Sequence, residues 1–145
     1  MAVRSIILDT DVGTDVDDAF AIAQAARSPD LDLRAVTTVY GDVHLRARLA
    51  RKLLDLLGHS GVPVAAGLGQ PLTPDKVPYW GGWEGEGLLT PADDALPLDP
   101  RDGVTLMLDE LAAALEPLTL VAVGPLTNIA AVIQRGGGLL DRIQE

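Results

Sequence analysis

The chain has 145 residues, a formal net charge of −10, 48% hydrophobic residues and no cysteine. This length and composition suit one globular domain with a hydrophobic core and exclude a disordered chain. The negative charge argues against nucleic-acid and anionic-membrane partners, and the lack of cysteine excludes disulfides, thiolate metal sites and a cysteine nucleophile. The first residues lack a signal-peptide core, and no apolar run approaches the about 18 residues of a membrane span, so we expect a cytoplasmic protein.

Apolar segments that favour strands alternate with segments of helical periodicity. The predicted strands are residues 5–8, 33–39, 62–66 and 118–123. The predicted helices are residues 17–27, 44–57 and 103–115, and a fourth that starts near residue 128 and ends at glycines 136–138. This alternation is typical of right-handed crossovers and a parallel sheet. We therefore predict an α/β fold, an open Rossmann-like sheet with helices on both faces and the strand order 3-2-1-4.

The second predicted helix has leucines 45, 49, 53 and 56 at helical spacing, which indicates its buried face. Its charged residues are expected to form a solvated face: Arg46, Arg48, Arg51 and Lys52.

Residues 67–102 form a long segment rich in glycine and proline. Long loops without regular structure are usually functional, so we expect a flap over a ligand. The segment contains Trp80 and Trp83, which could stack on a ligand or could plug the core beneath the loop.

Five aspartates stand within ten residues where the first strand gives way to the first helix: Asp9, Asp11, Asp15, Asp17 and Asp18. Like charges this close repel one another unless a cation lies among them, and carboxylate oxygens suit Ca²⁺ or Mg²⁺. Ligands of open α/β sheets bind at the carboxyl ends of the strands, which is where this cluster lies. Some of these residues could instead cap helices, with Asp9 and Asp15 as candidates, and Asn128 could cap the fourth helix.

The aspartate segment resembles D-x-D-P-G-x-D-D-A, the opening motif of the inosine–uridine preferring nucleoside hydrolase family. In residues 9–19 two residues are added between the glycine and the final aspartate pair, and Val12 replaces the proline. Three further family segments follow in order, T-T-V-x-G-N at 37–42, P-V-A-A-G at 63–67 and G-P-L-T-N-I-A at 124–130. Several motifs in family order identify the chain as similar to the N-terminal part of this family.

The resemblance implies hydrolysis of the N-glycosidic bond of a nucleoside with a bound Ca²⁺. Asp11 would be a metal ligand and the base that activates the attacking water. Asp18 and the main-chain carbonyl of Val123 would be further metal ligands, and Asp15 is another candidate. Asp17 would hold a ribose hydroxyl, although the added residues let Asp15 compete for that role.

The resemblance also implies three further substrate-binding residues. Asp42 stands where the family often has asparagine, and would contact the ribose. Trp83 stands where many members have histidine, which favours stacking on the base. Asn128 belongs to the G-P-L-T-N segment and is the third candidate.

Family members are longer, so residues 1–145 are expected to be an N-terminal portion of the hydrolase domain. The fourth strand would then be an unpaired sheet edge, which favours a homo-oligomer or a complementing C-terminal chain. An inactive fragment or a binding module that keeps the cleft is an alternative. A haloacid-dehalogenase-type phosphatase, with Asp9 as nucleophile and Asp11 as acid/base, is a weaker one because it leaves Asp15, Asp17 and Asp18 unexplained.

Overall fold

The computed structural model describes residues 3–73, 75–79 and 81–144. Its centre is a four-stranded parallel sheet with the order β3-β2-β1-β4, which confirms the predicted fold class and strand order. The strands are β1 (Arg4–Thr10), β2 (Leu31–Thr38), β3 (Val64–Ala66) and β4 (Thr119–Ala122). The helices are α1 (Asp17–Arg27), α2 (Val43–Leu56), α3 (Gly103–Ala113) and α4 (Thr127–Gly136). Two 3₁₀ helices are η1 (Pro91–Ala95) and η2 (Gly137–Arg142).

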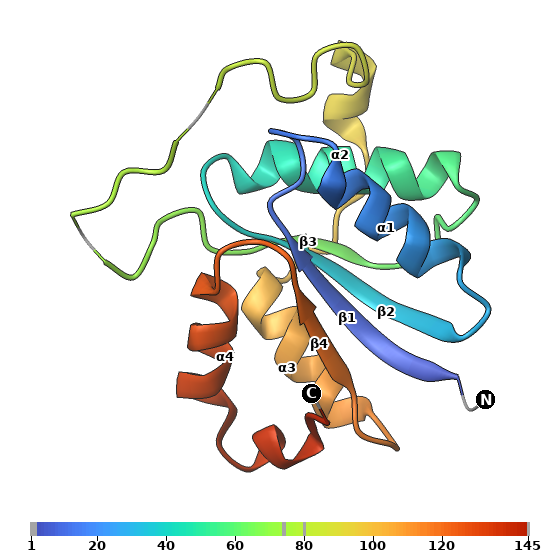
Figure 1. Cartoon of the computed structure of the whole chain (residues 1–145), viewed down its shortest axis with the longest axis vertical. Coiled ribbons are helices and arrows are strands. Elements are labelled where there is room, and N and C mark those ends of the chain that lie inside the picture. The colour runs from blue at the N-terminus through green and yellow to red at the C-terminus, as the bar shows by residue number, and fades with distance from the viewer. Residues whose placement is uncertain (1–2, 74, 80, 145) are drawn as a thin grey trace.

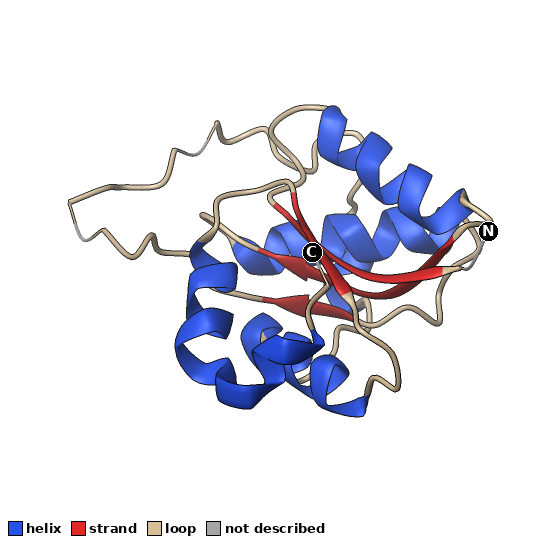
Figure 2. Ribbon diagram, turned by 60° about the horizontal axis from the view of Figure 1, so that its bottom comes forward, coloured by secondary structure: helices blue, strands red, loops and turns tan. Residues whose placement is uncertain are grey.

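Helices cover both faces of the sheet. Helices α1 and α2 lie on one face and α3 and α4 on the other, and the strands run between them (Figures 1 and 2). Along β1, Ile6 and Leu8 belong to the core under α1 and α2, whereas Ile7 belongs to the core under α3 and α4. A strand that is covered on both faces carries apolar side chains on both sides, which is why Ile6, Ile7 and Leu8 form a continuous apolar run in β1.

The buried face of α2 matches the predicted one at Leu45, Leu49 and Leu53, which lie in or against the core, and differs at its end and at two arginines. Leu56 is 67% exposed, and the prediction of a solvated charged face is wrong for two arginines. The buried residues of the helix are Val43, Arg46, Ala47, Leu49, Ala50, Arg51 and Leu54. Arg51 donates hydrogen bonds to the carbonyls of His59 (3.0 Å) and Val62 (2.6 Å), so its charge is buried with bonded donors.

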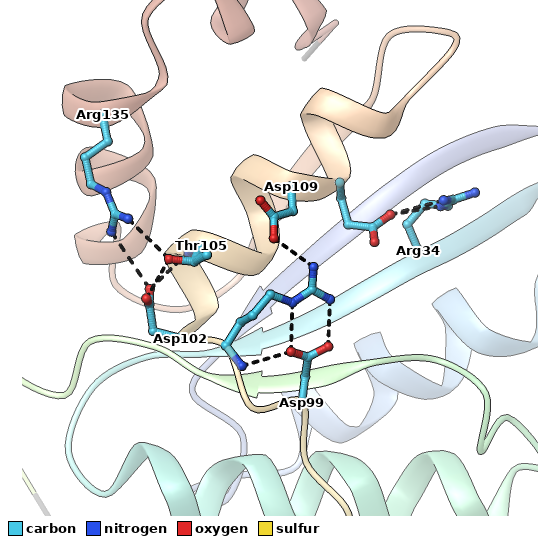
Figure 3. Close-up of polar contacts among 8 residues, drawn as sticks. Arg34, Asp99, Asp102, Thr105, Asp109 and Arg135 are labelled. Atoms are coloured by element: carbon cyan, nitrogen blue, oxygen red, sulfur yellow. Dashed lines mark hydrogen bonds and ion pairs between the residues drawn. The ribbon is translucent and has the colours of Figure 1, made fainter.

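A group of polar contacts holds the start of α3 (Figure 3). Arg101 contacts the carboxylates of Asp99 (2.7 Å) and Asp109 (2.9 Å). Asp102 caps α3, and Arg135 of α4 lies 3.9 Å from its carboxylate. Exposed ion pairs contribute little individually, so these contacts orient the two helices more than they stabilise the fold.

Strand β4 lies at the edge of the sheet, as predicted, but the residue before it pairs with residues near the end of the chain. Leu118 donates to the carbonyl of Arg142 (2.8 Å) and accepts from the amide of Gln144 (2.8 Å), in a parallel bridge with Ile143. Within the described residues, β4 itself pairs with β1 alone. The expectation of an unpaired edge therefore holds for β4 and fails at the residue before it.

The segment from β3 to α3 contains η1 as its one helical element among the described residues, and part of it swings away from the sheet (Figure 1). Its later part is attached to α2. Asp93 accepts hydrogen bonds from Lys52 (2.7 Å) and from the amide and hydroxyl of Thr90 (both 2.8 Å). None of the described helices is long and apolar enough to cross a membrane.

The attachment of η1 predicts an acid-sensitive contribution to stability. The hydrogen bonds from Lys52 and Thr90 lower the pKa of Asp93 from 3.8 to about 2. A carboxyl whose pKa is lower in the folded state stabilises the fold above pH 4, and this contribution is lost as the pH falls towards 2. Asp93→Asn should therefore lower the melting temperature at pH 7 and flatten its change between pH 4 and pH 2, measured by circular dichroism. The neighbouring exposed Asp94→Asn is the control, and matching profiles for the two variants would contradict the assignment.

Candidate functional site

A cleft of about 380 Å³ lies at the carboxyl end of β1. It is lined by Asp11, Thr14, Asp15, Asp17, Asp18, Tyr40, Tyr79 and Val123. These residues come from the β1–α1 loop, the start of α1, the β2–α2 turn, the long segment after β3 and the end of β4. The cleft lies between β1 and β4, whose following helices pack on opposite faces, which is where open α/β sheets bind ligands.

Short-range contacts shape the β1–α1 loop. The hydroxyl of Thr10 donates to Asp18 (2.5 Å) and accepts from the amide of Val12 (3.1 Å). Gly13 has a φ of 130°, and a Cβ on it would lie 2.7 Å from Cδ1 of Leu49. The loop therefore needs glycine at this point, and it returns the chain to α1 with Asp18 buried.

The carboxylates of the loop crowd one another. Ligand oxygens of Asp15, Asp17 and Asp18 all lie within 4.8 Å of one another. A hydrogen bond between Asp15 and Asp17 raises the pKa of Asp15 and lowers that of Asp17. Burial raises the pKa of Asp18, and the charges of Asp11 and Asp17 raise it further. Crowded hard oxygens of this kind suit a divalent cation such as Ca²⁺ or Mg²⁺, so the donor set fits the predicted metal.

Asp11 lies outside that group of three but lines the same cleft. Burial raises its pKa, the charge of Arg46 opposes this, and the charges of Asp15 and Asp17 add to it. A Cβ on Gly124 would lie 2.8 Å from Oδ1 of Asp11, so the turn after β4 passes directly against this carboxylate. The structure thus brings Asp11 into one cleft with Asp15, Asp17, Asp18 and Val123, as the sequence predicted.

Asn128 is not the cap that the sequence suggested. The cap position of α4 is Leu126, and no side chain bonds there. Asn128 is completely buried, donates to Asp9 (2.8 Å) and to the carbonyl of Thr38 (3.0 Å), and accepts from the amide of Leu68 (2.8 Å). Both of its polar atoms are occupied by the protein, so the geometry supports a structural role beneath the site over direct substrate contact.

Asp9 does not cap a helix either. Its side chain is 1% exposed and accepts from Thr37 (2.7 Å) and Asn128. Burial raises its pKa to about 6, against the lowering effect of those two hydrogen bonds. A carboxyl enclosed in this way cannot reach a substrate, so the phosphatase alternative, which needs Asp9 as nucleophile, has no support in the structure. Asp15 likewise makes no capping bond, because the cap position of α1 is Val16 without a side-chain contact.

Two predicted substrate residues lie apart from the cleft lining. Asp42 is exposed and caps α2 by accepting from the amide of Leu45 (3.0 Å). Trp83 is 49% exposed, and its ring lies against Gly81: a Cβ placed on Gly81 would be 2.6 Å from the ring. Trp80 falls outside the described residues. The substrate roles of Asp42 and Trp83 stay predictions.

The sequence reasoning missed two tyrosines of the cleft. Tyr40 has a φ of 71°, and its hydroxyl accepts from the amide of Tyr79 (2.7 Å), which fixes the long segment beside the aspartates. The same segment also lies against the β1–α1 loop at the buried Glu84. A Cβ placed on Gly13 would be 3.5 Å from the Cβ of Glu84. One sequence feature could have indicated that Tyr40 lies at the cleft: it stands immediately before Gly41, in the turn that follows a strand.

Comparisons with known proteins point to nucleoside hydrolases. A family model described as inosine-uridine preferring nucleoside hydrolase matches residues 6–145. The chain is 42% identical over 137 residues to a pyrimidine-specific ribonucleoside hydrolase of Photobacterium profundum, covering 90% of this chain and 43% of that protein. It is 40% identical over 150 residues to the inosine-uridine preferring nucleoside hydrolase of Crithidia fasciculata, covering 98% and 46%. A solved inosine-guanosine nucleoside hydrolase superposes with a TM-score of 0.82 at 32% identity, over 98% of this chain and 46% of that one. The chain therefore spans less than half the length of these relatives.

The buried amide of Asn128 should be essential to the fold beneath the site. Asn128→Ala leaves Asp9, the carbonyl of Thr38 and the amide of Leu68 without this partner, and unsatisfied buried groups cost about 1–3 kcal/mol each. We predict a loss of about 3 kcal/mol in the free energy of unfolding, measured by urea denaturation. Gln134→Ala, an exposed amide in the same helix, should change it by less than about 0.5 kcal/mol. Equal effects of the two substitutions would contradict the role of Asn128.

Proposed function

The chain belongs to the inosine-uridine preferring nucleoside hydrolase family, and we propose that it supplies the cation- and ribose-binding carboxylates of an enzyme that hydrolyses ribonucleosides to base and ribose. The observation that carries this proposal is the cleft in which Asp11, Asp15, Asp17 and Asp18 meet at the carboxyl end of β1. The relatives named above as ribonucleoside hydrolases support the same reaction class.

We propose Ca²⁺ as the cation. Its ligands would be the carboxylates of Asp11 and Asp18 and the main-chain carbonyl of Val123, with Asp15 as a further candidate, and all four residues line the cleft. When bound there, a divalent cation lowers the pKa of a coordinated water and offers a contact for ribose hydroxyls. Burial raises the pKa values of Asp11 and Asp18, and the charges of neighbouring aspartates raise them further. A cation bound among these carboxylates would offset their repulsion.

Asp11 is the proposed general base. It is partly buried at the floor of the cleft, and burial raises its pKa, which makes its carboxylate a better proton acceptor for the attacking water. Asp17 is exposed, and its lowered pKa keeps it ionised, so it can accept a hydrogen bond from a ribose hydroxyl. The negative charge of the cluster also favours the oxocarbenium-like charge that develops on the sugar.

The aromatic residues of the cleft are proposed to face the base. Tyr40 and Tyr79 line the cleft, and Trp83 lies further along the same segment as Tyr79. Aromatic faces stack on purines and pyrimidines alike, which gives binding energy without selecting one base. Asp42 stays a proposed ribose contact. A homo-oligomer, a complementing C-terminal chain and a cytoplasmic location also stay predictions.

Ribose release from a panel of purine and pyrimidine nucleosides tests the reaction. We expect release in the presence of Ca²⁺, none after chelation, and a rate about 100-fold or more lower in Asp11→Ala, because a general base contributes at least that factor. Asp30→Ala, an exposed aspartate in the turn after α1, should keep the wild-type rate. Release that is independent of Asp11 would overturn the mechanism. A folded chain that binds Ca²⁺ without turnover would favour the inactive fragment or binding module.

Calcium binding tests the ligands separately from turnover. Asp18→Asn removes a buried anionic ligand but keeps a side chain that can still accept from Thr10, so we expect a folded protein with little Ca²⁺ affinity. Isothermal titration calorimetry measures the affinity, and circular dichroism checks the fold. Wild-type affinity in this variant would exclude Asp18 from the metal site.

A further inference from the structure

One guanidinium group lies directly beneath the aspartate cleft. Arg46 of α2 is completely buried. Its Nε donates to the carbonyl of Tyr40 (2.7 Å), its Nη1 to the carbonyls of Val12 (3.0 Å) and Asp11, and its Nη2 to the hydroxyl of Thr14 (3.3 Å). These acceptors belong to two separate loops, the one after β1 and the turn after β2, and both line the cleft.

Both loops need an external restraint. Tyr40 is held at a φ of 71°, a conformation that disfavours side chains larger than glycine, and its carbonyl accepts from Arg46. The β1–α1 loop is two residues longer than the motif it resembles, and Val12 replaces a proline that would have fixed its φ. Arg46 bonds on both sides of Gly13, at Val12 and Thr14, which is where the loop has the most freedom.

The shape of the side chain matters to this arrangement. Arginine presents five donors on a rigid plane, so one group can bond carbonyls from two loops at once. Lysine carries its donors on a single nitrogen and cannot reach acceptors this widely spread. The position therefore requires the guanidinium geometry as well as a positive charge.

We propose that Arg46 is a positioning residue that holds the β1–α1 loop against the β2–α2 turn and so gives the aspartate cleft its affinity for a divalent cation. The proposal rests on the proposed Ca²⁺ site and adds a residue to which neither the sequence motif nor the cleft lining points.

The alternative is that Arg46 acts only as a neighbouring charge, and the two roles predict opposite signs. A positive charge near the cleft repels a cation, so removing the charge alone would tighten Ca²⁺ binding. Removing the restraint would instead let the carboxylates separate and weaken binding, because supporting residues commonly contribute 10- to 100-fold to metal affinity.

The test is Ca²⁺ titration calorimetry on the full 145-residue chain and its variants. Arg46→Met should weaken Ca²⁺ binding by about tenfold or more, and Arg46→Lys, which keeps the charge, should weaken it by more than about threefold. Arg51→Met is the matched control, since Arg51 is 3% exposed in the same helix but bonds carbonyls away from the cleft. It should lower the melting temperature and leave the Ca²⁺ affinity within about twofold of wild type.

Each outcome decides between the alternatives. If Arg46→Met does not fold, Arg46→Lys decides alone, because it retains the buried charge and most of the stem. Unchanged or tighter binding in the folded Arg46 variants would overturn the inference while leaving the proposed function intact. A wild-type chain that binds no Ca²⁺ would overturn the metal site itself, and the inference with it.

Discussion

The repulsion among carboxylates at the end of a buried strand is the constraint on which this structure depends. Four of them line one cleft, where burial raises the pKa values of Asp11 and Asp18 and the charges of neighbouring aspartates raise them further. An isolated loop of this sequence would separate its charges in water. The fold keeps them together with contacts from outside the cluster: the hydroxyl of Thr10, the guanidinium of Arg46 and the turn at Gly124. The folded core therefore holds together carboxylates that would repel one another in an isolated loop.

The topology explains why these contacts converge. Strand β1 is central, so its carboxyl end receives loops from β2 on one side and β4 on the other. Successive side chains of β1 reach opposite faces of the sheet: Thr10 bonds Asp18 of α1, and Asp9 accepts from Asn128 of α4. Asn128 in turn joins Thr38 of β2 and the start of the long segment. Polar contacts of β1 therefore support the site from both helical layers.

The elements and the cleft could be predicted from sequence because their signals are local. Among the described residues, periodicity located the four strands and the four α-helices but neither 3₁₀ helix, and strand ends followed by aspartates indicated the binding edge. The partners of Arg46, Arg51 and Asn128 could not be predicted, because each bonds main-chain groups outside its own helix, and a carbonyl carries no residue-specific signal. One signal was available: Arg46 and Arg51 flank the small residues Ala47 and Ala50, on a stripe that also spaces Val43 and Leu54 at helical intervals.

Arg46 places a buried positive charge beside the proposed metal site, and its hydrogen bonds go to the two loops that form that site. Its hydrogen bonds to the carbonyls of Tyr40 and Val12 and to the hydroxyl of Thr14 restrain both loops that line the cleft. One positive charge against four carboxylates also leaves the cleft strongly negative. At the proposed site the charge of Arg46 would repel a divalent ion to some extent, but a loop that is ordered before an ion binds lowers the entropic cost of binding.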